Sequence, residues 1–110
     1  MDCEYHFALT QRAKQDVRQS VGYIRNELGN EKAAKILMND LDKCIERLCI
    51  FPESGKLVFD EYLPGAHVRR KIVGKYILFY QVLKEEKIVR ILRIVYGCRD
   101  MDEVFRHMDS

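Results

Sequence analysis

The hydrophobic residues between positions 68 and 96 are concentrated in short runs of the kind that form β-strands. They form three runs, at residues 68–73, 76–83 and 88–96, which are rich in β-branched and aromatic side chains. Gly74 and Lys75 separate the first two runs, and a glycine at the first of two connecting residues favours a tight hairpin turn. Four charged residues separate the second run from the third. The pattern therefore predicts an antiparallel three-stranded meander.

The first strand of this meander differs from the two that follow it. The later strands carry apolar side chains in both alternating sets, which is typical of strands covered on both faces. In the first strand Arg69 and Lys71 share one face, whereas Arg70 shares the other with Val68 and Ile72. Charge on both faces is typical of an edge strand or of a strand that faces a ligand.

A short segment near the N-terminus alternates with the two-residue period of a β-strand. Across residues 3–9 the apolar side chains of Cys3, Tyr5, Phe7 and Leu9 fall on one side of an extended chain. The segment therefore predicts a strand with one buried face.

Two amphipathic helices follow this strand. Apolar residues recur at three- or four-residue spacing over residues 11–28 and again over residues 31–49. Thr10 and Asn30 stand where the side chain of an N-cap residue would accept a backbone hydrogen bond, and Pro52 comes just after the second helix. Because only two residues separate the helices, they should form an antiparallel hairpin.

These elements together predict an α+β fold. The helix hairpin must bury its apolar stripes, so we expect it to pack on a four-stranded, mainly antiparallel, twisted sheet made of the N-terminal strand and the meander. The chain has 110 residues, which is a common size for one domain, so residues 1–110 are expected to form a single domain. Residues 52–65 should form an ordered connecting loop, and residues 102–108 a short terminal helix.

Composition narrows the range of functions. The chain is 47% hydrophobic and 33% charged, and it contains neither a run long enough to span a bilayer nor a signal sequence, so we expect a cytoplasmic protein with no membrane partner. Its four cysteines include no C-x-x-C pair, which argues against a zinc site. No cofactor is expected.

Charge is unevenly distributed along the chain. Residues 66–100 contain nine Lys and Arg against three Asp and Glu, a net charge of +6, although the whole chain carries only +2. The predicted sheet is therefore basic and the remainder of the chain is acidic. A basic sheet of this kind favours contact with a polyanion or with an acidic protein segment.

The order of these elements, together with three short motifs, resembles the RelE/ParE superfamily of toxins from type II toxin–antitoxin modules. The motifs are Pro-Glu-Ser-Gly at 52–55, Tyr-Ile-Leu-Phe-Tyr at 76–80 and Ile-Leu-Arg-Ile-Val-Tyr-Gly-Cys-Arg-Asp at 91–100. The resemblance covers nearly the whole chain. It implies a helix hairpin on a twisted antiparallel sheet, a cognate antitoxin as partner, and a toxin–antitoxin hetero-oligomer.

The RelE branch of this superfamily cuts messenger RNA on the ribosome and needs basic strand residues and a proton-transfer group. Here Ile77 follows Tyr76 where RelE has an arginine, and Phe105 stands where RelE has a functional tyrosine. Phenylalanine carries no exchangeable proton. If the chain were nevertheless a metal-independent endoribonuclease, the resemblance would make Tyr96, Arg99 and Arg93 its catalytic residues.

The ParE branch poisons DNA gyrase, and its terminal pattern R-[IV]-[LV]-H-G-x-R-D is matched at 93–100 except that Tyr96 replaces the histidine. The resemblance therefore leans to ParE, with DNA gyrase as the expected target and the ribosome with its mRNA as the alternative. A non-toxic module that binds RNA or protein also stays open. Whichever target applies, the expected contact residues are Arg69, Arg70, Lys71, Arg93 and Arg99.

Overall fold

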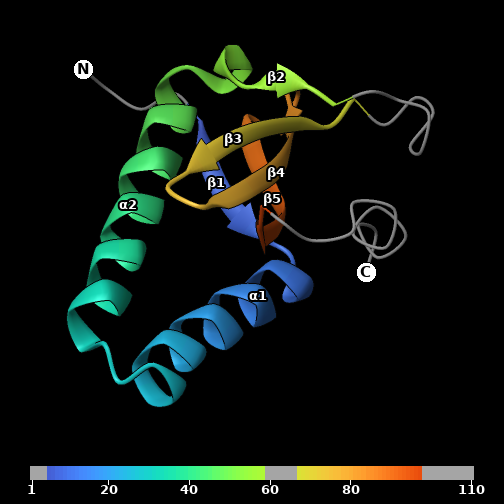
Figure 1. The fold of residues 1–110 in the computed structure, drawn as a ribbon. Coiled ribbons are helices and arrows are strands. Elements are labelled where there is room, and N and C mark those ends of the chain that lie inside the picture. Colours follow the sequence, from blue (N-terminus) through green and yellow to red (C-terminus); the bar gives the residue numbers. More distant parts are fainter. Residues whose placement is uncertain (1–4, 59–66, 98–110) are drawn as a thin grey trace.

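The computed structural model describes residues 5–58 and 67–97, and within them two helices lie on one face of a twisted sheet (Figure 1). The elements in chain order are β1 (His6–Leu9), α1 (Gln11–Gly22), the π-helical segment η1 (Tyr23–Glu27), α2 (Glu31–Ile50), the 3-10 turn η2 (Pro52–Ser54), β2 (Lys56–Leu57), β3 (Arg69–Val73), β4 (Tyr76–Leu83) and β5 (Ile88–Tyr96). The α+β class predicted from the sequence is confirmed. None of the helices in these two ranges is long and apolar enough to cross a membrane.

The sheet has the strand order β1-β5-β4-β3-β2. The three meander strands pair antiparallel as predicted, and β1 pairs parallel with β5 at one edge. The sheet has five strands among the described residues, not the four predicted, because β2 pairs with Arg69 and Arg70 of β3. Two residues are too few to show an alternating pattern, so this strand lay unrecognised in the predicted loop. Cys3 and the predicted terminal helix lie outside the described residues.

Both helices begin at the predicted caps. The Thr10 side chain accepts a hydrogen bond from the Ala13 backbone N–H, and Asn30 Oδ1 accepts one from Ala33. Between the helices, Gly29 adopts a left-handed φ of 60° that reverses the chain. Figure 1 shows α1 and α2 meeting at this reversal and diverging toward the sheet, where α1 packs against β5 and α2 against β3.

The two faces of the sheet are both lined by buried apolar residues. Leu78, Tyr80 and Ile91 belong to the core beneath the helices, whereas Phe79 and Leu92 belong to a second cluster on the opposite face. This confirms that the central strands are covered on both sides. The N-terminal strand departs from its prediction.

In that N-terminal strand, Leu9 and Tyr5 pack against the helix-side core, but Phe7 is 55% exposed. Because β1 is an edge strand, it has a neighbouring strand on one side only. The prediction that Phe7 is buried was therefore wrong.

Candidate functional site

The predicted contact residues of β3 fall on opposite faces of the sheet. Residues directly opposite each other in an antiparallel pair share a face, and Arg69 and Lys71 lie opposite Tyr80 and Leu78 of the helix-side core. Arg70 lies opposite Phe79, so its side chain is on the face away from the helices. The strand thus divides its three cations between two surfaces.

Arg69 is held by the turn that follows α2. Its Nη1 donates hydrogen bonds to the backbone carbonyls of Glu53 at 3.1 Å and Gly55 at 2.8 Å. A guanidinium with two carbonyl acceptors is fixed in orientation. The primary contact of Arg69 is therefore with its own chain.

Tyr80 holds the same turn through hydrogen bonds of its hydroxyl group. Its buried hydroxyl donates a hydrogen bond of 2.7 Å to the Pro52 carbonyl and accepts one of 2.9 Å from the Gly55 backbone N–H. Burial raises the pKa of the Tyr80 hydroxyl, which keeps it protonated as the donor it needs to be. A Cβ at position 55 would stand 2.5 Å from Tyr80 Oη and 2.6 Å from the Arg70 carbonyl oxygen. These contacts explain why the Pro-Glu-Ser-Gly motif ends in glycine.

An exposed ion pair lies beside this turn. Lys84 Nζ is 2.8 Å from Glu53 Oε1, and this hydrogen bond lowers the pKa of Glu53 and raises that of Lys84. The two side chains border a hollow of about 530 Å³ that Arg69, Leu57 and Val82 also line. Its lining includes both acidic and basic side chains, so it offers no single sign of charge to a ligand.

Arg93 is buried in an ion pair with Asp16 of α1. Its Nε lies 2.7 Å from Asp16 Oδ2 and its Nη2 lies 3.1 Å from Oδ1, while Asp16 Oδ2 also accepts a 3.0 Å hydrogen bond from the Ile94 backbone N–H. Arg93 is 6% exposed and Asp16 is 7% exposed. The guanidinium that the sequence places in a target-binding set therefore has its partner within the chain.

This ion pair sits at an irregularity of β5. Phe79 pairs with Arg93 and Tyr80 pairs with Ile91, which leaves Leu92 as an extra residue. The Leu92 carbonyl accepts a hydrogen bond from the Thr10 hydroxyl. The pairing of β5 with β1 ends at Ile91. Beyond that point, Thr10 and Asp16 supply the hydrogen-bond partners of the Leu92 carbonyl and the Ile94 N–H. The signal for this was Asp16 itself, a carboxylate on the apolar stripe of α1 three residues after Ala13.

Tyr96, at the end of β5, is 42% exposed. Its ring packs edge-on against Tyr76, with 5.6 Å between the ring centroids, and Tyr76 in turn packs on the helix-side core. Tyr96 is therefore on the same face as Lys71. Arg99, like Cys98 and Phe105, lies outside the described residues.

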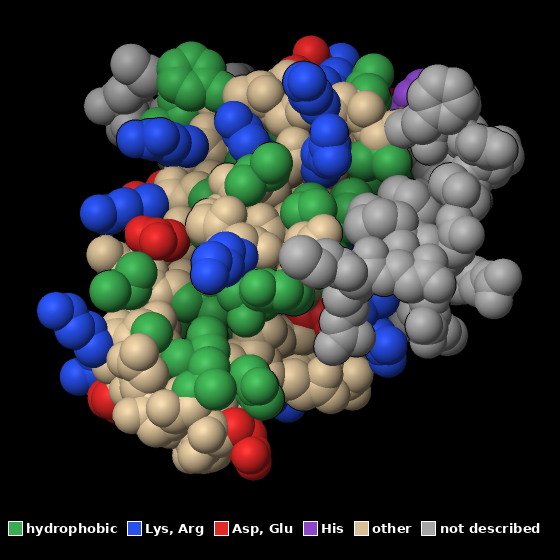
Figure 2. Space-filling model, viewed as in Figure 1, with side chains coloured by type: hydrophobic (Ala, Val, Ile, Leu, Met, Phe, Trp, Pro, Cys, Tyr) green, Lys and Arg blue, Asp and Glu red, His purple; other side chains and the backbone are tan. Residues whose placement is uncertain are grey.

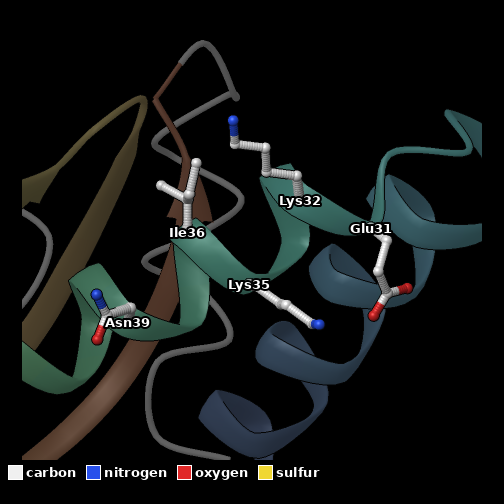
Figure 3. Close-up of a pocket in the computed structure, with 5 residues that line it drawn as sticks. All are labelled: Glu31, Lys32, Lys35, Ile36 and Asn39. Carbon is white, nitrogen blue, oxygen red and sulfur yellow. The ribbon is translucent and has the colours of Figure 1, made fainter.

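The described surface shows no enclosed cavity that matches the predicted site. In Figure 2 Lys and Arg side chains lie over α2 and the β2–β3 side of the sheet, with hydrophobic side chains exposed among them. A shallow hollow of about 570 Å³ on α2 is lined by Glu31, Lys32, Lys35, Ile36 and Asn39, whose side chains project in different directions (Figure 3). Such a surface suits a macromolecular partner better than a small ligand.

Within the described ranges no cluster of His, Cys, Asp and Glu could hold a metal ion. Cys44 is a half-buried thiol, and burial raises its pKa although Lys71 and Arg47 nearby oppose the shift. A thiol with a raised pKa is a poor nucleophile at neutral pH. Cys44 packs against the helix-side core, and Cys49 is buried.

Comparison with known proteins finds a family that matches most of the chain. Residues 7–101 match the family described as the ParE toxin of the type II toxin-antitoxin system parDE. No curated protein sequence matches the chain significantly.

The solved structures that share the fold include three from toxin–antitoxin systems. A chromosomal ParDE system from P. aeruginosa has a TM-score of 0.65 and 18% identity, covering 86% of this chain and 98% of the other. The RelBE2 toxin–antitoxin complex from Mycobacterium tuberculosis has a TM-score of 0.62 and 23% identity, covering 84% and 98%. A mutant of the E. coli toxin RelE in the free state has a TM-score of 0.59 and 19% identity, covering 96% and 95%.

Proposed function

The chain belongs to the ParE family of toxins from type II toxin–antitoxin systems, and we propose that it is a growth inhibitor held in check by a cognate antitoxin. Two of the structures that share its fold belong to a ParDE system and to a RelBE2 toxin–antitoxin complex. The exposed cations of the sheet suit an acidic antitoxin that folds as it binds. In this proposal the antitoxin and the chain form a hetero-oligomer.

For the target we propose DNA gyrase, and the observation that carries this is the division of the predicted cations between two faces of the sheet. Cleavage of RNA by its own 2′-hydroxyl builds negative charge on one phosphate, so the cations that stabilise it must converge. Arg70 lies on the face away from the helices, Lys71 and Tyr96 lie on the helix side, and Arg93 is buried against Asp16. Arg69 shares the helix side with Lys71, so the described residues of the predicted set do not all lie on one face.

The outer face of β3 supports a protein target. Ile72 is 69% exposed on that face, next to the exposed Arg70. An exposed aliphatic residue beside an arginine is a common feature of protein interfaces, where arginine is enriched. We assign Arg70 and Ile72 to the contact with gyrase, and we place Arg93 in a structural role.

The test compares two activities and two variants. The chain is induced alone in bacteria, and the purified protein is assayed for inhibition of gyrase supercoiling and for ribosome-dependent cleavage of mRNA. Arg70→Glu should abolish growth arrest and supercoiling inhibition because it reverses a charge in the interface. Tyr96→Phe should leave both intact. Lys43→Glu, an equal charge reversal on the exposed side of α2, is the matched control and should also remain toxic.

A second candidate function, endoribonuclease activity, is favoured by the exposure of Tyr96. Its phenol is accessible and lies on the same face as Lys71, and a positioned tyrosine hydroxyl can serve as a general acid or base in proton transfer. Cleavage of ribosome-bound transcripts that disappears in Tyr96→Phe, by roughly the 10²–10⁴-fold expected for loss of a general acid or base, would replace gyrase as the target.

A further inference from the structure

The exposed side of α1 is cationic, and no exposed carboxylate balances it. Between Gln11 and Gly22 the helix carries Arg12, Lys14 and Arg18, and its one acidic residue is Asp16. Asp16 is buried and already paired with Arg93. The solvent side of α1 therefore presents the exposed cations of Lys14 and Arg18, with the half-buried Arg12 beside them, and no exposed carboxylate.

The neighbouring helix shows that this is not a general property of the surface. α2 contains four basic and four acidic residues, and it exposes the apolar side chains of Ile36 and Met38. By contrast, the exposed large hydrophobic residues of the described chain include none from α1. The outer sides of the two helices thus differ in both charge and polarity.

Four polar residues of α1 form one continuous stripe. Gln11, Lys14, Gln15 and Arg18 are all exposed, and their spacing of three and four residues places them on one side of the helix. Lys14 and Arg18 are one turn apart, about 6 Å along the helix axis. Two long cationic side chains at that separation can reach neighbouring phosphates of one strand, with the glutamine amides as additional hydrogen-bond donors.

The cations of this stripe have no acidic partner among the residues that the structure describes. The salt bridges of the described chain that involve α1 or η1 join Arg93 to Asp16 and Arg25 to Glu31, and neither includes Lys14 or Arg18. Arg12, at the border of the stripe, is half-buried and its Nε has no hydrogen-bond partner. Figure 1 shows α1 at the far side of the molecule from β2 and β3.

We propose that the outer stripe of α1, formed by Gln11, Lys14, Gln15 and Arg18, binds the phosphodiester backbone of a nucleic acid. The absence of exposed apolar residues on α1 favours this ligand over an acidic protein segment, because a segment that folds on binding needs apolar anchors. A hydrated phosphate backbone needs only cations and hydrogen-bond donors. The surface is distinct from the β3 interface, so the inference does not depend on whether the target is gyrase or the ribosome.

Salt dependence of binding tests the proposal. A labelled DNA duplex of random sequence and a labelled single-stranded RNA are titrated with the full chain by fluorescence anisotropy, and polyglutamate serves as an acidic polypeptide. The double variant Lys14→Gln/Arg18→Gln removes two charges from the stripe. The matched control Lys35→Gln/Lys43→Gln removes two exposed charges from α2. Thermal melting of each variant checks that the fold is retained.

The stripe variant should lower the slope of log affinity against log salt by roughly 1.8 for DNA or about 1.4 for single-stranded RNA, with the α2 control unchanged. Between about 50 and about 200 mM salt, the wild-type protein should then lose roughly twelve times more affinity for DNA than the stripe variant. The nucleic acid with the larger change is the preferred source of the phosphate. Equal effects of both variants, stripe-dependent binding of polyglutamate as tight as that of nucleic acid, or no binding at low salt would each overturn the proposal.

Discussion

Replacing Asp16 with alanine should destabilise the fold severely, because it removes the partner of a buried charge. The Arg93 guanidinium makes two hydrogen bonds to the Asp16 carboxylate, and the two side chains are only 7% and 8% exposed. Breaking a buried ion pair by removing one partner costs about 3–5 kcal/mol. The Ile94 N–H loses its acceptor in the same variant, which makes the upper part of this range the better expectation.

That loss is large compared with the stability of a domain of this size. Small domains unfold with a free energy of about 5–15 kcal/mol, and each kcal/mol shifts the melting temperature by roughly 4–8 °C. Asp16→Ala should therefore lower the melting temperature by at least about 12 °C. Arg93→Met should have a comparable effect, because it leaves the carboxylate buried with one backbone N–H.

The decisive measurement is a double-mutant cycle followed by urea unfolding. The cycle compares wild type, Asp16→Leu, Arg93→Met and the variant that carries both changes. The double variant replaces the pair by apolar side chains, and such a replacement often recovers the stability that either single change loses. The double variant should be more stable than both single variants, yet remain about 1–3 kcal/mol below wild type because Ile94 N–H stays without its acceptor. A double variant as unstable as the sum of the two single losses would refute the idea that the charges matter to each other. Retained toxicity in the double variant would further support a structural role for Arg93.

Two further predictions concern the turn after α2. Tyr80→Phe should cost about 1–3 kcal/mol for each backbone group it leaves unpaired at Pro52 and Gly55. It should also remove a pH dependence of stability. Burial raises the pKa of Tyr80, so the stability of the wild-type protein should fall as pH rises above about 10, whereas the variant lacks this titration. Midpoints of urea unfolding measured across alkaline pH would show the difference. Gly55→Ala should destabilise by overlap with Tyr80 Oη and the Arg70 carbonyl, and adding Tyr80→Phe should relieve only the first overlap. Full recovery of the melting temperature in that pair would contradict the role assigned to the backbone contact.

The regular elements were predictable because their signals are local. β4 and β5 have the bounds that the runs of β-branched, aromatic and other apolar residues predicted, and Thr10 and Asn30 cap the helices at the predicted positions. Each signal needs only neighbours in the sequence: a period of apolar residues or a polar side chain before a helix.

The candidate site was less predictable because its contacts are distant in sequence. Asp16 binds Arg93, which lies 77 positions later in the sequence. Tyr80 binds the Pro52 carbonyl through its hydroxyl, but a hydrophobic pattern predicts only that its ring is buried. The sheet face on which each cation of β3 lies also depends on how β3 pairs with β4. A count of charges along the sequence does not contain that information. For this reason the sequence predicted that Arg93 contacts the target, although its partner is Asp16 on α1.

The parallel pairing of β1 with β5 has a consequence for synthesis on the ribosome. β1 and the Asp16 carboxylate are translated early, but their partners are Ile88–Tyr96 and Arg93. At about 5–20 residues per second, the nascent helices wait several seconds or more for the strand that covers them. A chain that ends before β5 lacks the strand that joins β1 to β4. Activity should then arise only from molecules translated through almost all of β5, which gives the cell an interval between the start of synthesis and the appearance of a functional protein.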